Sequence, residues 1–165
     1  AKLFCRNVIN KYNIHFNDTK NYSELSFLLM YKVANVDYIY INGDIYVKKQ
    51  ENNELNIDIE KYQEYIKNII WFIKETEEKN MNKENIAKEI YNALLNIYIY
   101  YNQNFHDNMI NSILIESQQI YLKYKEYQNL INEEDKYKIF TTKEFTKIPL
   151  ISLYDFFNLI EKTMI

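Results

Sequence analysis

Glycine and proline are almost absent from this chain, which contains one of each among 165 residues. Average usage would give about eleven glycines and about eight prolines in a chain of this length. The phosphate-binding loops of P-loop NTPases, Rossmann domains and protein kinases need several glycines, because the backbone approaches phosphate closely there. Since the only glycine is Gly43, these three classes are excluded. The same scarcity removes most turn-forming residues and favours long uninterrupted helices.

Residues that bind metals or act as nucleophiles are also scarce. Cys5 is the only cysteine, so it cannot form a disulfide within the chain. His15 and His106 are the only histidines, and neither lies in a spacing typical of a zinc site. We therefore predict no catalytic residues, no cofactor and no metal, and we expect that the protein is not an enzyme. A small enzyme without a recognisable motif is kept as an alternative.

Arginine occurs once, at Arg6, and the formal net charge is −3. Nucleic-acid binding depends on a basic surface, and guanine is usually read by arginine, so the sequence disfavours a nucleic-acid partner. The uninterrupted apolar runs are shorter than the roughly 18–20 residues that a bilayer requires, and no transmembrane segment is predicted. No signal segment is visible. The chain begins with Ala1, and whether it is a fragment of a longer protein is left open. Its localisation and oligomeric state are left open as well.

The most apolar stretch covers residues 86–101, IAKEIYNALLNIYIYY, with apolar or aromatic residues on nearly every helical face. A helix of this kind needs cover on most sides, so we expect it to be the buried centre of a domain. Apolar residues at helical spacing predict further helices before and after it. The expected helical ranges are 2–14, 21–36, 58–79, 82–103, 107–131, a single turn from Thr141 to just before Pro149, and 152–164.

Polar residues that cap helices mark several of these boundaries. Asp58, Asp107 and Ser152 are expected to cap the helices that follow them, and another helix begins near Asn82. Between the last two long helices, residues 132–135 are interpreted as a charged turn. Residues 137–141 are interpreted as a short strand or an extended connection.

Residues 37–48 depart most clearly from the helical pattern. Asn42-Gly43 is the preferred pair for a two-residue type I′ turn, because both positions need positive φ. The flanking residues are β-branched and aromatic, as strands prefer. The predicted fold is therefore mainly α: a single-domain helical bundle of five or six helices, with one β-hairpin at about residues 37–48 after the second helix. The domain would cover residues 1–165, with a helix–helix–hairpin part over 1–50 and a helical bundle over 57–165.

The range 107–131 contains a heptad-like seam, in which buried-type residues alternate at spacings of three and four. The seam positions are Ile110, Ile113, Ser117, Ile120, Tyr124, Tyr127 and Ile131. Such a pattern is typical of a helix that packs along a neighbouring helix. We expect the seam to lie inside an intramolecular bundle, and an exposed partner-binding stripe is the alternative.

Tyrosine is abundant, with 17 residues, and so are Asn, Ile and Lys. All four have AT-rich codons, so part of this surplus reflects the genome. Tyrosine is also favoured at binding surfaces, because its rigid ring gives a large contact area at low entropic cost. We therefore predict a non-catalytic protein-interaction module or a subunit of a larger assembly, with a protein as partner. The predicted partner-binding residues are Tyr38, Tyr40, Tyr46, Tyr121, Tyr124 and Tyr127.

A nucleic-acid-binding module is the alternative from a different class. The helix–loop–helix–hairpin order predicted over residues 1–50 resembles a winged helix, with Asn42-Gly43 at the tip of the wing. The negative net charge and the single arginine argue against this alternative.

Overall fold

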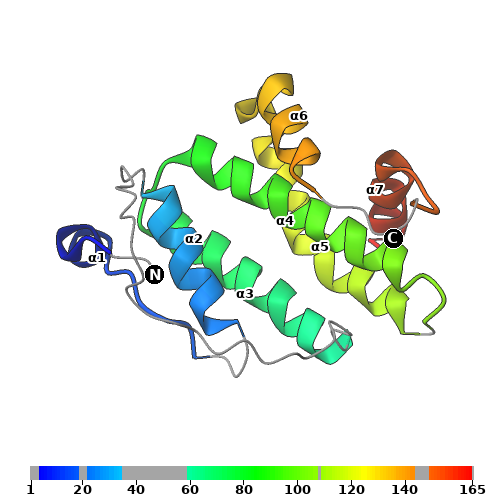
Figure 1. Ribbon diagram of the computed structural model, residues 1–165, viewed down its shortest axis with the longest axis horizontal. Helices are drawn as coiled ribbons and strands as arrows, with labels where there is room; N and C mark the ends of the chain where they lie inside the picture. The colour runs from blue at the N-terminus through cyan, green and yellow to red at the C-terminus, as the bar shows by residue number, and fades with distance from the viewer. Residues whose placement is uncertain (1–3, 19–21, 35–58, 108, 144–148, 165) are drawn as a thin grey trace, which may run out of the picture.

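The computed structural model describes residues 4–18, 22–34, 59–107, 109–143 and 149–164. Within these ranges the chain forms seven α-helices and one short 3-10 helix, and no strand. The α-helices are α1 (Arg6–Tyr12), α2 (Ser23–Val33), α3 (Ile59–Glu78), α4 (Lys83–Gln103), α5 (Ile110–Tyr127), α6 (Glu133–Thr141) and α7 (Leu153–Lys162); the 3-10 helix η1 (Gln128–Leu130) follows α5. Helices α2 to α5 lie alongside one another, and α6 and α7 pack on the outside against α4 and α5 (Figure 1).

Helix α4 is the centre of the bundle. It contacts α2, α3, α5 and α6, and most of its side chains are buried. It begins after the N-cap Asn82, whose side-chain oxygen accepts a 2.9 Å hydrogen bond from the backbone N–H of Asn85. Both the buried position predicted for residues 86–101 and the helix start near Asn82 are confirmed.

The whole predicted seam is buried: six of its positions lie on α5, and the seventh, Ile131, follows the 3-10 helix η1, so the helix ends earlier than predicted. All seven seam positions are inaccessible or nearly so, and Ile113 and Ile120 are completely buried. The helix packs most extensively against α4 and also contacts α3 and α7. Burying a large aliphatic side chain contributes roughly 1.5–3 kcal/mol to stability, so a continuous seam fixes α5 firmly in the bundle. The seam belongs to the core of this chain, and the exposed-stripe alternative is wrong.

Residues 133–141 form the helix α6, so the predicted turn over 132–135 and the predicted strand or extended connection over 137–141 are wrong. Asn132 is the N-cap of this helix. Its side-chain oxygen accepts a 2.7 Å hydrogen bond from the backbone N–H of Asp135.

Local interactions explain why α6 is helical. Its first turn carries three carboxylates, which the positive end of the helix dipole stabilises. Lys136 pairs with Glu133, and Lys138 pairs with Glu134, each across one helical turn. Such a pair contributes only a few tenths of a kcal/mol. Together with the cap, however, the pairs outweigh the preference of the aromatic and β-branched residues in this segment for strands.

The β-hairpin predicted at residues 37–48 lies outside the described residues, and so does the helix cap predicted at Asp58. The hairpin, the unit over residues 1–50 and the winged-helix alternative built on it remain predictions. The described ranges contain more helices than the expected five or six, chiefly because α6 is a helix. Thr141 is the last residue of α6, so it does not cap a following helix as predicted, and residues 144–148 of that predicted turn lie outside the described residues.

Two other predicted boundaries can be compared with the structure. Ser152 caps α7 as expected, because its hydroxyl oxygen accepts a 3.0 Å hydrogen bond from the backbone N–H of Asp155. Asp107 accepts a 2.8 Å hydrogen bond from the backbone N–H of Met109, although Met109 itself occupies the N-cap position of α5. None of the helices in the described ranges is long and apolar enough to cross a lipid bilayer.

Candidate functional site

The contact line between α3 and α5 is polar near both of its ends. Near the start of the two helices, Gln63 of α3 donates a 3.2 Å hydrogen bond to the hydroxyl of Ser112 of α5. Near their C-terminal ends, Nζ of Lys123 lies 2.8 Å from Oε1 of Glu77. The two helices therefore run in the same direction, and a groove lies between these contacts.

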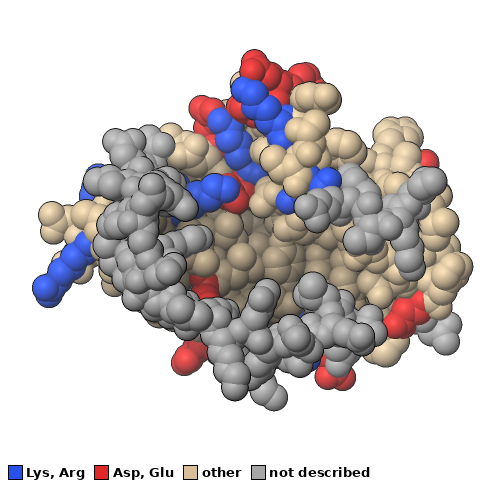
Figure 2. Space-filling view, viewed as in Figure 1, with Lys and Arg blue, Asp and Glu red and all other residues tan. Residues whose placement is uncertain are grey.

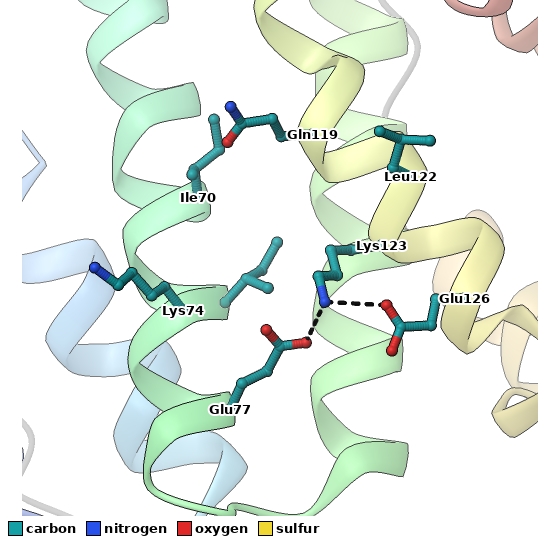
Figure 3. Close-up of a pocket in the computed structure, with 8 residues that line it drawn as sticks. Ile70, Lys74, Glu77, Gln119, Leu122, Lys123 and Glu126 are labelled. Atoms are coloured by element: carbon teal, nitrogen blue, oxygen red, sulfur yellow. Dashed lines mark hydrogen bonds and ion pairs between the residues drawn. The ribbon is translucent and has the colours of Figure 1, made fainter.

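The groove has a volume of about 320 Å³ and is formed by side chains of both helices. It is lined by Ile70, Ile73, Lys74, Glu77, Gln119, Leu122, Lys123 and Glu126. Figure 3 shows Gln119 reaching from α5 towards Ile70, while the ammonium group of Lys74 points away from α5. Leu122 is 57% exposed although its side chain is large and apolar. The walls of the groove are thus apolar, and its charges gather at one end.

A charged cluster closes that end of the groove. Lys123 bridges Glu77 and Glu126, with distances of 2.8 and 3.0 Å to their carboxylate oxygens (Figure 3), and Tyr127 donates a 2.6 Å hydrogen bond to Glu77. Burial raises the pKa of the Glu77 carboxyl, but the hydrogen bonds from Lys123 and Tyr127 outweigh burial and hold the pKa below its ordinary value. The hydrogen bond to Glu77 in turn raises the pKa of Lys123. Glu77 and Lys123 therefore stabilise each other's ionised forms.

Glu116, one turn before Gln119 on α5, has the opposite character. Its Oε2 atom is buried and has no hydrogen-bond partner within the described part of the chain. Burial raises the pKa of the Glu116 carboxyl, and the positive charge of Lys67 on α3 offsets this only in part. The same line of contact between α3 and α5 thus holds one carboxylate that is well stabilised as an anion and one that is not.

The predicted partner-binding tyrosines fall into two groups. Three lie outside the described residues: Tyr38, Tyr40 and Tyr46. The other three lie together on the core side of α5: Tyr121, Tyr124 and Tyr127. The structure therefore brings the second group together, but it buries their rings.

The contacts of these rings are made within the chain. The ring of Tyr121 lies 5.3 Å from that of Phe157 of α7, and the ring of Tyr124 lies 5.7 Å from that of Tyr91 of α4, measured between centroids. The hydroxyl of Tyr121 donates a 2.6 Å hydrogen bond to Glu161. Binding of a partner through these tyrosines remains a prediction.

The residues of the groove were not expected to form a site. The available signal was the pair Ile115 and Leu122, which lie seven residues apart on α5 and outside the buried seam. Seven residues are close to two helical turns, so both side chains share one face, and both are 57% exposed. The sequence gives no indication that α3 runs beside this face, and therefore no indication of a groove.

Comparison of the chain with protein-family models, with curated proteins and with solved structures finds no significant match. In the described ranges, no group of three or more His, Cys, Asp or Glu side chains is arranged to hold a metal ion. What the groove can do follows from its own geometry: it can receive an apolar side chain beside a cluster of ionised groups.

Proposed function

We propose that the protein is a non-catalytic protein-interaction module, or a subunit of a larger assembly, that binds an amphipathic helix of a partner protein along α5. The observation that carries this proposal is the groove in which Leu122 stays 57% exposed beside Ile70 and Ile73. An apolar side chain of the partner would fill the groove and cover Leu122. Full burial of one leucine contributes roughly 1.5–3 kcal/mol, which suits one anchor of an interface.

The spacing of the exposed apolar residues favours a helix as the bound element. Ile115 and Leu122 lie about 10.5 Å apart along α5, because each residue advances a helix by about 1.5 Å. A partner helix lying along α5 repeats its own apolar residues at the same distance, as in other helix-in-groove complexes. Gln119 and Glu126 lie on the same face and supply a polar rim.

The charges at the closed end of the groove favour a basic residue on the partner helix. Two carboxylates, those of Glu77 and Glu126, share the ammonium group of Lys123 there, while the ammonium group of Lys74 points away from α5 (Figure 3). This end is negative overall, so a Lys or Arg near the apolar anchor gains a favourable interaction. The expected partner is therefore a helix with apolar residues seven positions apart and a basic residue beyond one of them.

Affinity capture from the cells that naturally contain the protein, followed by mass spectrometry, tests the proposal with a matched pair of variants. Leu122→Asp places a carboxylate in the groove. Leu150→Asp makes the same change at a leucine that is 59% exposed and does not line the groove. We expect one set of captured proteins to be lost with Leu122→Asp and retained with Leu150→Asp, while circular dichroism shows both variants folded.

A photo-reactive residue introduced at Leu122 identifies the bound element directly. We expect a crosslink to a helical segment with the apolar and basic pattern given above. Capture that is identical for wild type and both variants, or crosslinks no more specific than those from exposed Tyr154, would show that the groove is not the binding surface. A crosslink to a second copy of the chain would instead identify self-association.

A further inference from the structure

A second hollow, of about 260 Å³, lies where α2, α4 and α6 meet. This cleft is lined by Lys32, Lys88, Glu89, Asn92, Lys138, Ile139 and Thr142. Figure 2 shows acidic and basic side chains mixed over α6 and in the region between α6 and α2. What the cleft can bind therefore depends on which of its polar groups are already paired.

The lysines that line the cleft are each paired with a carboxylate. The pairs are Lys32 with Glu89, Lys88 with Glu84 and Asp135, and Lys138 with Glu134. These carboxylates balance the positive charge of the three lysines, so the cleft does not favour an anion. It does not favour a cation either, because the ammonium groups line the cleft directly, whereas Glu89 is the one paired carboxylate that does so. The charges favour an uncharged ligand.

Glu89 is a buried acceptor that is only half satisfied. Its side chain is 7% exposed, and Oε1 lies 2.5 Å from Nζ of Lys32. Oε2 is buried too and has no hydrogen-bond partner within the described part of the chain. A buried carboxylate oxygen without a donor is unfavourable. A ligand that brings an N–H group into the cleft can therefore form a strong hydrogen bond with Oε2.

Asn92 supplies a donor beside this acceptor. It lies three residues after Glu89 on α4, and residues at this spacing are neighbours on the helix surface. The side-chain oxygen of Asn92 accepts a hydrogen bond from Lys143, which a second hydrogen bond, of 2.7 Å to Asn96, holds in place. Because its oxygen is occupied, Asn92 offers its amide N–H groups to a ligand. The α4 wall of the cleft thus carries an acceptor and a donor next to each other.

We propose that the cleft binds a small uncharged ligand through a primary carboxamide group, which Glu89 and Asn92 recognise. The amide nitrogen of the ligand donates to Oε2 of Glu89, and its oxygen accepts from the amide of Asn92. A carboxamide carries its donor and its acceptor on one carbon atom, which matches this wall of the cleft. The flexible side chain of Lys32, which is 55% exposed, moves aside as the ligand enters, and Ile139 provides an apolar contact. Binding does not depend on the groove between α3 and α5.

Four probes of similar size and shape test the chemistry of the site on the whole chain. Benzamide carries the carboxamide, acetophenone has a methyl group in place of its NH2, benzoate is an anion, and benzamidine is a cation. Each is titrated into the protein, and backbone amide chemical shifts are followed by NMR. We expect benzamide to bind several-fold more tightly than the other three and to shift the signals of Glu89, Asn92 and Ile139.

Every other order of affinities counts against the proposal. Equal binding of acetophenone would show that Oε2 of Glu89 does not accept a hydrogen bond from the ligand. Tighter binding of benzoate or benzamidine would show that the cleft selects a charged group. Shifts confined to other parts of the chain, or no binding of any probe, would show that the cleft is not a carboxamide site.

A matched pair of variants separates recognition by Glu89 from a general effect of lost charge. In Glu89→Gln the remaining oxygen still pairs with Lys32, so the new amide nitrogen takes the place of Oε2 and cannot accept a hydrogen bond. Glu116→Gln makes the same change at the other carboxylate with a buried, unpartnered Oε2, which does not line the cleft. We expect the affinity for benzamide to fall several-fold in Glu89→Gln and to stay unchanged in Glu116→Gln. Equal affinities in the two folded variants would overturn the proposal. If Glu89→Gln does not fold, the four probes on the wild type decide alone.

Discussion

The two hollows of this bundle differ in where their charges lie. In the groove between α3 and α5 the walls are apolar, and the ion pairs of Lys123 stand at the rim with access to water. In the cleft between α2, α4 and α6, the carboxylate of Glu89 is buried and the amine of Lys143 is half-buried. Exposed pairs contribute at most about 1 kcal/mol, whereas a buried charge depends strongly on its partner. The same kind of substitution should therefore have different consequences at the two sites.

The largest effect is expected from Ile120→Asp, because it would remove the groove altogether. Ile120 is completely buried on the seam side of α5. A carboxylate placed there has no partner, so the variant should lose about 3–5 kcal/mol of stability or fail to fold. Urea denaturation followed by circular dichroism measures the loss.

The matched control for Ile120→Asp is Leu122→Asp, two residues further along the same helix. Because Leu122 is largely exposed, its replacement should change stability by no more than about 0.5 kcal/mol. Similar losses in the two variants would mean that the two faces of α5 are not distinguished as the structure shows.

The next effect concerns the buried carboxylate of the cleft. Lys32→Met removes the ammonium group that lies 2.5 Å from Glu89. Breaking a fully buried pair costs roughly 3–5 kcal/mol, but Lys32 is 55% exposed and water can partly replace it, so we expect a loss of about 1–2 kcal/mol. Denaturation at pH 7 measures it. A loss below about 0.3 kcal/mol would show that Glu89 does not depend on Lys32.

A smaller effect is expected from the same substitution at the groove. Lys123→Met removes the ion pairs to Glu77 and Glu126. These groups are accessible to water, so the loss should be below about 1 kcal/mol and should decrease when salt is added. Denaturation in low and high salt checks both statements. A loss larger than that of Lys32→Met would reverse the comparison of the two hollows.

The smallest effect expected is a change with pH in the stability that two carboxyl groups beside the groove contribute. Because the pKa of Glu116 is raised, the folded state binds the carboxyl proton more tightly than the unfolded state does. Protonated Glu116 therefore favours folding at low pH, and this stabilisation is lost as the pH rises through the folded-state pKa. Glu116→Gln should therefore stabilise the fold by a few tenths of a kcal/mol at pH 7 and by less at pH 4.

The lowered pKa of Glu77 gives the opposite sign. Its contribution is present above the ordinary carboxyl pKa and is lost as the pH falls through the folded-state pKa, so Glu77→Gln should destabilise the protein at pH 7 more than at pH 3. Thermal unfolding of both variants across this range provides the comparison. Parallel pH profiles for the two variants would contradict the assignment of opposite environments to these carboxylates.

Most of what could be predicted about the helices came from the periodic spacing of apolar residues. The seam of α5 and the central position of α4 were both readable, because the burial of a helical face repeats along the sequence every three or four residues. The cap at Ser152 was readable because it is a local hydrogen bond. The helix α6 was not, since Tyr137 and Ile139 favour strands and the opposing cap and charge pairs are each weak.

The sequence by itself determined that this chain forms a helical bundle around residues 86–101, because a local pattern of apolar residues dictates which faces must be covered. Only the tertiary structure decided where the two hollows lie. Ile70 and Leu122 belong to different helices, and Lys143 meets Asn96 although the two residues are 47 positions apart in the sequence. A helical pattern states that a face is buried or exposed, but it does not state which helix lies beside it. The pairing of helices, and with it both sites, depends on how side chains of distant segments fit together.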